Sequence, residues 1–213
     1  LLKLLSKELS PSKGNIWLNQ RQLQEYAIDE LARSRAVLSQ HNTLSISFRV
    51  DELVMMGRYP YFQQRASEED REIVRKVMSE TGIADFAHRD YNTLSGGEQQ
   101  RVQLARVMAQ IYGQVHTVLF LDEPTNGLDL LYQQQVLQSA SSYAKRGHLV
   151  IAILHDINFA AQYADQILML KAGKQVAYGS VQDVLKPDLL KEVFSIDISL
   201  FHTADYPYPI VVP

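Results

Sequence analysis

The feature that most constrains the fold is a succession of strand, helix and strand between residues 115 and 154. Residues 115–121 form a largely apolar run that predicts one buried strand, and residues 149–154 predict the next. Between them, residues 130–145 can form a helix, which Gly147 would stop. Two strands joined by a helical crossover lie parallel in one sheet, so the pattern predicts the α/β class.

Both predicted strands end in polar residues. Asp122 and Glu123 follow the first strand, and His155 and Asp156 follow the second. In open parallel sheets, ligands bind outside the carboxyl ends of the strands. We therefore expect the functional site at this edge of the sheet.

Composition excludes several classes of site. The chain has 213 residues, 46% of them hydrophobic and 21% charged, as in ordinary globular proteins. It contains no cysteine, which excludes disulfides and thiolate metal sites and fits the cytosol. A net charge of −3 argues against nucleic acid as the main ligand. We expect no membrane-spanning segment, because no run approaches the roughly 18 apolar residues that one needs.

The stretch 43–93 lacks strand-like runs and differs from its surroundings. It predicts a helix over 68–81, with Ser67 as N-cap and Gly82 as the stop. We expect residues 43–93 to form a helical subdomain inserted into a core made of 1–42 and 94–213. Near the C-terminus, 167–170 and 175–178 predict a β-hairpin around a glycine turn.

The strongest chemical signal is Leu-Ser-Gly-Gly-Glu-Gln-Gln-Arg at residues 94–101. Ser95 and Glu98 have the spacing of a capping box, so a helix begins here with its positive dipole end and free amides exposed. Gly96 and Gly97 would let a phosphate approach the backbone closely. A capped helix without a ligand is the alternative, but glycine is a poor helix former and weakens it.

This octapeptide resembles the signature motif of the ABC transporter ATPases. The resemblance implies a P-loop NTPase-type parallel-sheet core with an inserted helical subdomain, and ATP and Mg²⁺ as cofactors. In that family the motif closes over the γ-phosphate held by a facing subunit. A second copy of the chain is thus an implied partner, whose nucleotide would be contacted by Ser95, Gly96, Gly97 and Glu98.

Residues 119–125 resemble the Walker B segment, in which a buried strand delivers two adjacent carboxylates. The resemblance implies that Asp122 holds Mg²⁺ and that Glu123 is the general base, two tasks that phosphoryl transfer requires. Asp122 follows Ser95 by 27 residues, as the family requires.

Three further positions carry over from the family. Residues 126–129 resemble the D-loop at the dimer interface, where only Asp129 matches firmly because many relatives have Ser-Ala in place of Asn-Gly. His155, 33 residues after Asp122, resembles the switch histidine that contacts the γ-phosphate. Gln40 resembles the Q-loop glutamine that reaches Mg²⁺ and the attacking water.

The phosphate-binding loop Gly-x-x-x-x-Gly-Lys-Ser/Thr (Walker A) does not occur in the 213 residues. In the family this loop opens a helix like the one that residues 1–5 predict. Gln40 stands where the Q-loop glutamine belongs if the loop ended just before Leu1. We therefore expect the loop, and the aromatic residue that stacks on adenine, to precede Leu1 in the full gene product.

Substrate class rests on the helical subdomain. Residues 50–61 resemble its entry in importers of haem, ferric siderophores and cobalamin, and residues 89–91, 103–107 and 130–134 are most similar to the haem importers. The resemblance implies ATP hydrolysis that drives haem import at the cytoplasmic face of the inner membrane. Transmembrane permease subunits are the implied direct partners and a periplasmic haem-binding protein an indirect one. Import of a ferric siderophore or of cobalamin is the alternative.

Two other classes compete with the importer. A soluble ABC ATPase that acts on nucleic acid or ribosomes usually has two cassettes or long coiled-coil insertions, and this sequence shows neither. A non-catalytic scaffold should have lost Glu123 and His155. We expect no nucleic acid partner.

The helical subdomain also holds an aromatic cluster, Tyr59, Tyr61 and Phe62, next to Arg58. Buried interface centres favour aromatic residues and arginine. We expect the cluster to be exposed and to dock on the permease, with packing inside the subdomain as the alternative for Phe62.

Overall fold

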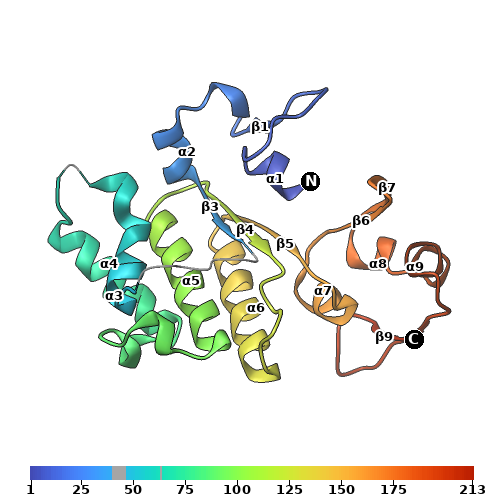
Figure 1. Cartoon of the computed structure of the whole chain (residues 1–213). Helices are drawn as coiled ribbons and strands as arrows, with labels where there is room; N and C mark the ends of the chain where they lie inside the picture. Colours follow the sequence, from blue (N-terminus) through green and yellow to red (C-terminus); the bar gives the residue numbers. More distant parts are fainter. Residues whose placement is uncertain (40–46, 63) are drawn as a thin grey trace. The chain divides into compact units, whose positions relative to one another are not determined.

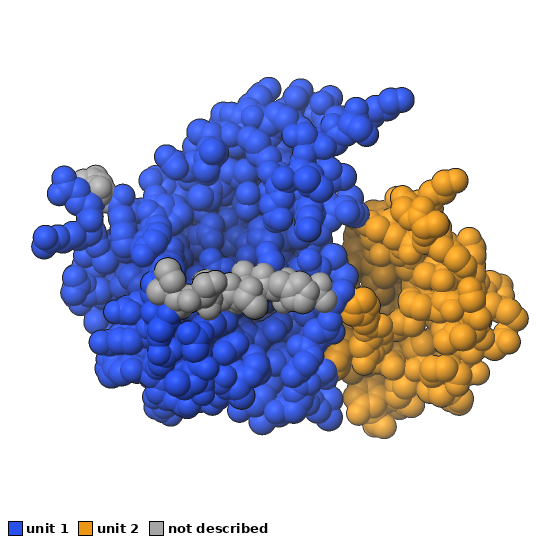
Figure 2. Space-filling view, in the orientation of Figure 1, with its two compact units in different colours: residues 1–153 blue, residues 154–213 orange. Residues whose placement is uncertain are grey.

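The computed structural model describes residues 1–39, 47–62 and 64–213. The chain divides into two compact units, Leu1–Ile153 and Leu154–Pro213, which Figure 2 distinguishes by colour. The first unit contains a parallel sheet with the strand order β3-β4-β5 (Figure 1). Its strands are β3 (Arg35–Leu38), β4 (Val118–Asp122) and β5 (Leu149–Ile153).

The three strands end together at one edge of the sheet. Leu38 of β3 is in register with Leu121, and Asp122 is in register with Ile153 of β5. Helix α6 (Leu130–Lys145) connects β4 to β5, and Gly147 follows it with a φ of 92°. The predicted α/β fold and the predicted helix at 130–145 are confirmed.

Two strand predictions need correction. Strand β4 begins at Val118 and not at residue 115, because the chain is still turning there: Val115 is 77% exposed and His116 has a left-handed φ of 53°. Strand β5 lies at the edge of the described sheet and is not buried, with Leu149 54% exposed.

Helix α5 (Gly96–Ile111) is the centre of the first unit. It packs against β3, α3 (Val50–Met55), α4 (Glu68–Glu80) and the 3-10 helix η2 (Met56–Tyr61). Its buried side chains share one apolar cluster with those of the sheet and of α3 and α4. Gly57 of η2 lies so close to α5 that an added Cβ would be 2.1 Å from the carbonyl oxygen of Arg106. Two short 3-10 helices, η3 (Ala84–Phe86) and η4 (Tyr91–Thr93), precede α5.

The predicted helix at 68–81 is confirmed as α4, one residue shorter. Ser67 caps it by accepting a hydrogen bond from the Asp70 amide at 3.1 Å, and Gly82 ends it with a φ of 65°.

The expected exposure of the aromatic cluster is confirmed only for Tyr59, and the neighbouring Arg58 is buried. Arg58 is 4% exposed because it is paired: Nε donates to Asp70 Oδ1 and Nη1 to the Ala109 carbonyl, both at 2.9 Å. Tyr61 is half-buried beneath this guanidinium, and its hydroxyl donates to the Gln110 carbonyl at 2.8 Å. Of the three aromatic residues, only Tyr59, 56% exposed, presents a largely open side chain.

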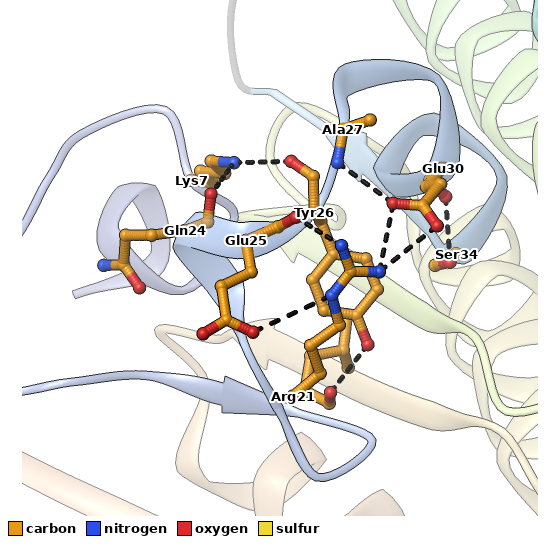
Figure 3. A network of polar contacts seen from close by, with 9 residues as sticks. Lys7, Arg21, Gln24, Glu25, Tyr26, Ala27, Glu30 and Ser34 are labelled. Atoms are coloured by element: carbon orange, nitrogen blue, oxygen red, sulfur yellow. Dashed lines mark hydrogen bonds and ion pairs between the residues drawn. The ribbon is translucent and has the colours of Figure 1, made fainter.

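The N-terminal segment comprises α1 (Leu2–Leu5), β1 (Trp17–Leu18), β2 (Arg21–Gln22), η1 (Leu23–Glu25) and α2 (Ile28–Ser34). Side-chain contacts of Arg21 and Lys7 connect the parts of this segment (Figure 3). Arg21 forms an ion pair with Glu30 at 3.1 Å and lies over the Tyr26 ring, while Lys7 Nζ donates to the Tyr26 carbonyl at 2.9 Å. A hydrogen bond from the Ala27 amide, aided by Arg21, lowers the pKa of Glu30.

The second unit has its own apolar core, which includes Met169, Leu190 and Val211. Its elements are α7 (Ile157–Tyr163), β6 (Ile167–Lys171), β7 (Lys174–Gly179), α8 (Val181–Val184), α9 (Pro187–Phe194), β8 (Ser199–Phe201) and β9 (Ile210–Val212). Strands β6 and β7 form the predicted hairpin, and Ala172 and Gly173 at its turn both have positive φ. Within the described ranges of both units, every helix is too short or too polar to span a bilayer.

Candidate functional site

The two adjacent carboxylates stand where β4 leaves the sheet. Asp122 is the last residue of the strand and Glu123 the next, and both are half-buried. Glu123 has a φ of 51°, which is uncommon for a residue other than glycine, and it precedes a proline, where extended backbone is favoured. Such conformations persist where the surrounding structure over-determines them, and they cluster at functional sites.

Hydrogen bonds from three side chains hold this turn. Gln100 Nε2 donates to the Pro124 carbonyl at 2.9 Å, and Gln133 Nε2 donates to the Thr125 carbonyl at 3.3 Å. Asn126 donates through Nδ2 to Glu123 Oε2 and through its amide to the Glu123 carbonyl at 3.2 Å. The turn is therefore fixed from α5, from α6 and from within itself.

The roles of Gln100, Gln133 and Asn126 at this turn were not predicted from the sequence. The two glutamines act on backbone carbonyls of another element, and no motif spacing records such a bond. Asn126 had a usable signal, since a turn residue with a short amide side chain often hydrogen-bonds a neighbour along the chain.

The donor set at the end of β4 suits Mg²⁺. In the described part of the chain, His, Asp and Glu side chains nowhere gather in groups of three or more that could hold a metal ion. Mg²⁺ does not need such a cage, because it is usually held by one or two carboxylates together with substrate phosphates and water. Asp122 and Glu123 fit that pattern.

The start of α5 is built as the sequence predicts. Ser95 Oγ accepts a hydrogen bond from the Glu98 amide at 3.3 Å, and Glu98 Oε2 accepts one from the Ser95 amide at 2.7 Å. Hydrogen bonds to the Glu98 carboxylate, first from the Ser95 backbone and then from the Ser95 side chain, lower the pKa of Glu98, and the charges of Arg89 and Arg101 act in the same direction. Ser95 itself is exposed.

The two glycines of this helix start differ in their surroundings. A Cβ at Gly96 would meet no atom within 4 Å, whereas one at Gly97 would lie 3.3 Å from Leu128 Cδ2. Gly96 is therefore open to an approaching ligand, and Gly97 allows close packing of α5 against the loop that follows Glu123. The structure thus brings the start of α5 together with residues 124–128.

Asp129 is the N-cap of α6, where its Oδ1 accepts a hydrogen bond from the Tyr132 amide at 3.1 Å. Its side chain is exposed. A cap of this kind is a sufficient structural reason for an aspartate here. Any contact between Asp129 and a facing subunit remains a prediction.

His155 and Gln40 are the two remaining predicted site residues. His155 is exposed and belongs to the second unit, directly before Asp156, which caps α7. Gln40 lies outside the described residues, two positions beyond the end of β3. The roles of both remain predictions.

Comparisons with a family model and with individual proteins point to the same family. A family model described as ABC transporter matches residues 1–126. The chain is 43% identical to the hemin import ATP-binding protein HmuV of Gloeobacter violaceus, over 100% of this chain and 78% of that protein. It is 44% identical to the hemin import ATP-binding protein HmuV of Pseudomonas entomophila, over 100% of this chain and 83% of that protein.

Two solved structures share the fold. One is an inward-facing putative metal-chelate type ABC transporter, with a TM-score of 0.82 and 22% identity over 100% of this chain and 80% of that chain. The other is a dimeric ATP-binding cassette in a post-hydrolysis state bound to ADP and phosphate. Its TM-score is 0.70 at 22% identity, over 84% of this chain and 78% of that chain.

Proposed function

Because this chain belongs to the ABC transporter family of ATP-binding subunits, we propose that it hydrolyses ATP to drive the import of hemin. One observation carries the substrate: the chain is similar over its whole length to two proteins that act in hemin import. That similarity includes the helical region, so it extends beyond the motifs that all ABC ATPases need.

The turn after β4 supports the catalytic assignment. Glu123, presented by a turn that three side chains hold, is the proposed general base for the attacking water. Asp122 is the proposed ligand of Mg²⁺, directly or through water. When bound, Mg²⁺ neutralises charge on the phosphates of ATP. Gln40 and His155 are proposed to assist at the water and at the γ-phosphate.

The exposed start of α5 supports an ATP-sandwich dimer. Ser95 and Gly96 face away from their own unit's packing, so a phosphate held by a second copy can reach them. We assign Ser95, Gly96, Gly97 and Glu98 to the nucleotide of the facing copy, and Asp129 to the dimer interface.

Residues 43–93 are the proposed helical subdomain, inserted into a core of 1–42 and 94–213. The described part of this range carries α3, η2, α4, η3 and η4. We propose that it docks on transmembrane permease subunits, with Tyr59 on the contact surface, while Tyr61 and Arg58 support that surface from below. The protein would then act at the cytoplasmic face of the inner membrane, and a periplasmic hemin-binding protein would deliver substrate to the permease.

Transport in reconstituted vesicles tests the substrate. The transporter is assembled from this subunit and its permease, and ATP-dependent uptake of hemin, of a ferric siderophore and of cobalamin is measured side by side. We expect uptake of hemin and stimulation of ATP hydrolysis by the hemin-loaded binding protein. Uptake of the siderophore or of cobalamin in place of hemin would overturn the substrate assignment and leave the ATPase assignment standing.

A further inference from the structure

Gln100 connects α5 to the turn after β4. It is the fifth residue of α5, one helical turn beyond the Ser95 cap. The Gln100 side chain is half-buried, and its Nε2 donates to the Pro124 carbonyl at 2.9 Å, a shorter bond than the one of 3.3 Å from Gln133 of α6 to the Thr125 carbonyl. Strand β4 ends at Asp122, so this bond holds the chain two residues beyond the last strand residue.

A second contact joins the same two elements. Gly97 packs so closely on the loop that an added Cβ would lie 3.3 Å from Leu128 Cδ2. The first turns of α5 therefore contact both ends of the segment 124–128. Gln100 bonds to Pro124 at one end, and Gly97 packs on Leu128 at the other. A rigid helix fixed to a loop at two points carries that loop with it when the helix shifts.

We propose that Gln100 is a positioning residue that makes the turn bearing Glu123 move together with α5. The start of α5 serves the nucleotide of the facing copy, whereas Glu123 serves the nucleotide of its own copy. Through Gln100, closure of α5 on the facing γ-phosphate sets the position of the base in the other site. This inference rests on the proposed function, because it takes Glu123 as the base and Ser95 as a contact to the facing nucleotide.

The backbone of Glu123 explains why one hydrogen bond matters here. Its left-handed φ before a proline is an unfavourable conformation that depends on outside contacts. Gln100 fixes the peptide plane that directly follows Pro124, and so it limits how far Glu123 can rotate away. A displacement of about 1 Å at a catalytic group can cost on the order of a hundredfold in rate.

The test replaces Gln100 by methionine, which keeps the length of the side chain and removes the N–H donor. ATPase kcat and the Kd for MgATP are measured on the assembled transporter. We expect kcat to fall about tenfold or more while Kd stays within about threefold, because the base is displaced and the phosphate contacts are kept. Gln100→Glu should lower kcat at least as much, because its ionised carboxylate faces a carbonyl oxygen.

Two matched variants separate coupling from general effects. Gln135→Met makes the same change at an exposed position of α6 and should leave kcat unchanged. Gln133→Met removes the longer hydrogen bond, in which Gln133 donates to the Thr125 carbonyl. Gln133 belongs to α6 and not to α5. Gln133→Met should lower kcat less than Gln100→Met does.

The outcomes are distinguishable. A kcat within about twofold of wild type for both Gln100→Met and Gln100→Glu overturns the inference, and so does a parallel loss of MgATP affinity and thermal stability. Glu123→Gln is measured in the same preparation. If Glu123→Gln abolishes turnover while Gln100→Met and Gln100→Glu both leave kcat within about twofold of wild type, the inference alone fails; if Glu123→Gln retains turnover, the proposed base fails.

Discussion

The start of α5 and the turn after β4 hold their key residues in different ways. At the start of α5, Ser95 and Glu98 satisfy each other through two hydrogen bonds that span three residues. At the turn after β4, Glu123 is left in a left-handed conformation and depends on Gln100 and Gln133 from two other helices. One region is set by its own sequence and the other by the packing of the unit.

This difference suits the tasks proposed for the two regions. A surface that must receive a ligand from a second copy has to keep its shape before that copy arrives, and a self-contained cap achieves this. A base that must act only when the site is complete gains from a position that depends on its surroundings. Under the proposed function, the locally encoded start of α5 would recognise the facing nucleotide, and the tertiary contacts of the turn after β4 would control the position of the base.

The largest expected effect comes from the turn. Glu123→Gln in the assembled transporter should lower ATP turnover by about 10²–10⁴-fold, the usual contribution of a general base, with MgATP affinity retained. Steady-state phosphate release and nucleotide binding measure the two quantities. Glu69→Gln, the same change at an exposed position of α4, is the control and should turn over normally. Turnover within a few-fold of wild type would remove Glu123 from the role of base.

Ser95→Arg tests the other region. The new side chain would fill the space in front of Gly96 where the facing γ-phosphate is expected, and hydrolysis should fall on the order of a hundredfold as when a phosphate-binding contact is lost. The subunit should remain folded, because Ser95 is exposed and a lost cap costs only about 1 kcal/mol.

Trapping of ATP in the dimer is the sharper measurement for this variant. Ser142→Arg places the same charge on the exposed surface of α6 and should trap ATP as the wild type does. A Ser95→Arg dimer that still traps two ATP molecules would contradict the sandwich arrangement and would make Ser95 a helix cap alone.

The difference between locally held residues and residues held by tertiary contacts also decides what could be predicted from the sequence. The caps at Ser67 and Ser95 and the helices that follow them were predictable because the interacting residues lie three apart in the chain. The burial of Arg58 was not, because it depends on Asp70 and on the Ala109 carbonyl, which only the fold brings together. Gln100 was visible inside the signature motif, but nothing along the chain indicates that its partner is Pro124.

The burial of strand β5 could not be predicted from its sequence either. Its apolar run predicted a strand correctly, yet its place at the edge of the described sheet leaves Leu149 largely exposed. Periodicity indicates that a segment forms a strand, and the order of strands decides what covers it.

A smaller effect is expected at Asp129, which belongs by sequence to the loop after the turn but is held like the start of α5. Asp129→Ala should lower the free energy of unfolding by about 1 kcal/mol through loss of the α6 cap. Asp129→Ser should restore most of it, because serine also accepts a hydrogen bond from the helix amides. Urea unfolding of the three proteins measures this. A loss of ATP turnover that serine does not restore would indicate that the carboxylate also acts across the dimer interface.

The smallest expected effect is a pH dependence at Glu98. Its pKa in the folded protein is below the ordinary value of 4.5, because the Ser95 amide and hydroxyl hydrogen-bond the carboxylate. A group whose pKa is lowered by folding stabilises the protein fully above its unfolded pKa, and this contribution is lost as the pH falls through the folded pKa.

The unfolding free energy of wild type should therefore exceed that of Glu98→Gln by about 0.5 kcal/mol at pH 7, as expected for an acidic residue in a first helical turn. The difference should vanish well below pH 4.5, where the carboxyl is protonated and glutamine can replace it in the capping box. Other acidic residues titrate in the same range, so the informative quantity is the difference between the two proteins at each pH. A difference that stays constant down to acid pH would mean that it does not come from the charge of Glu98.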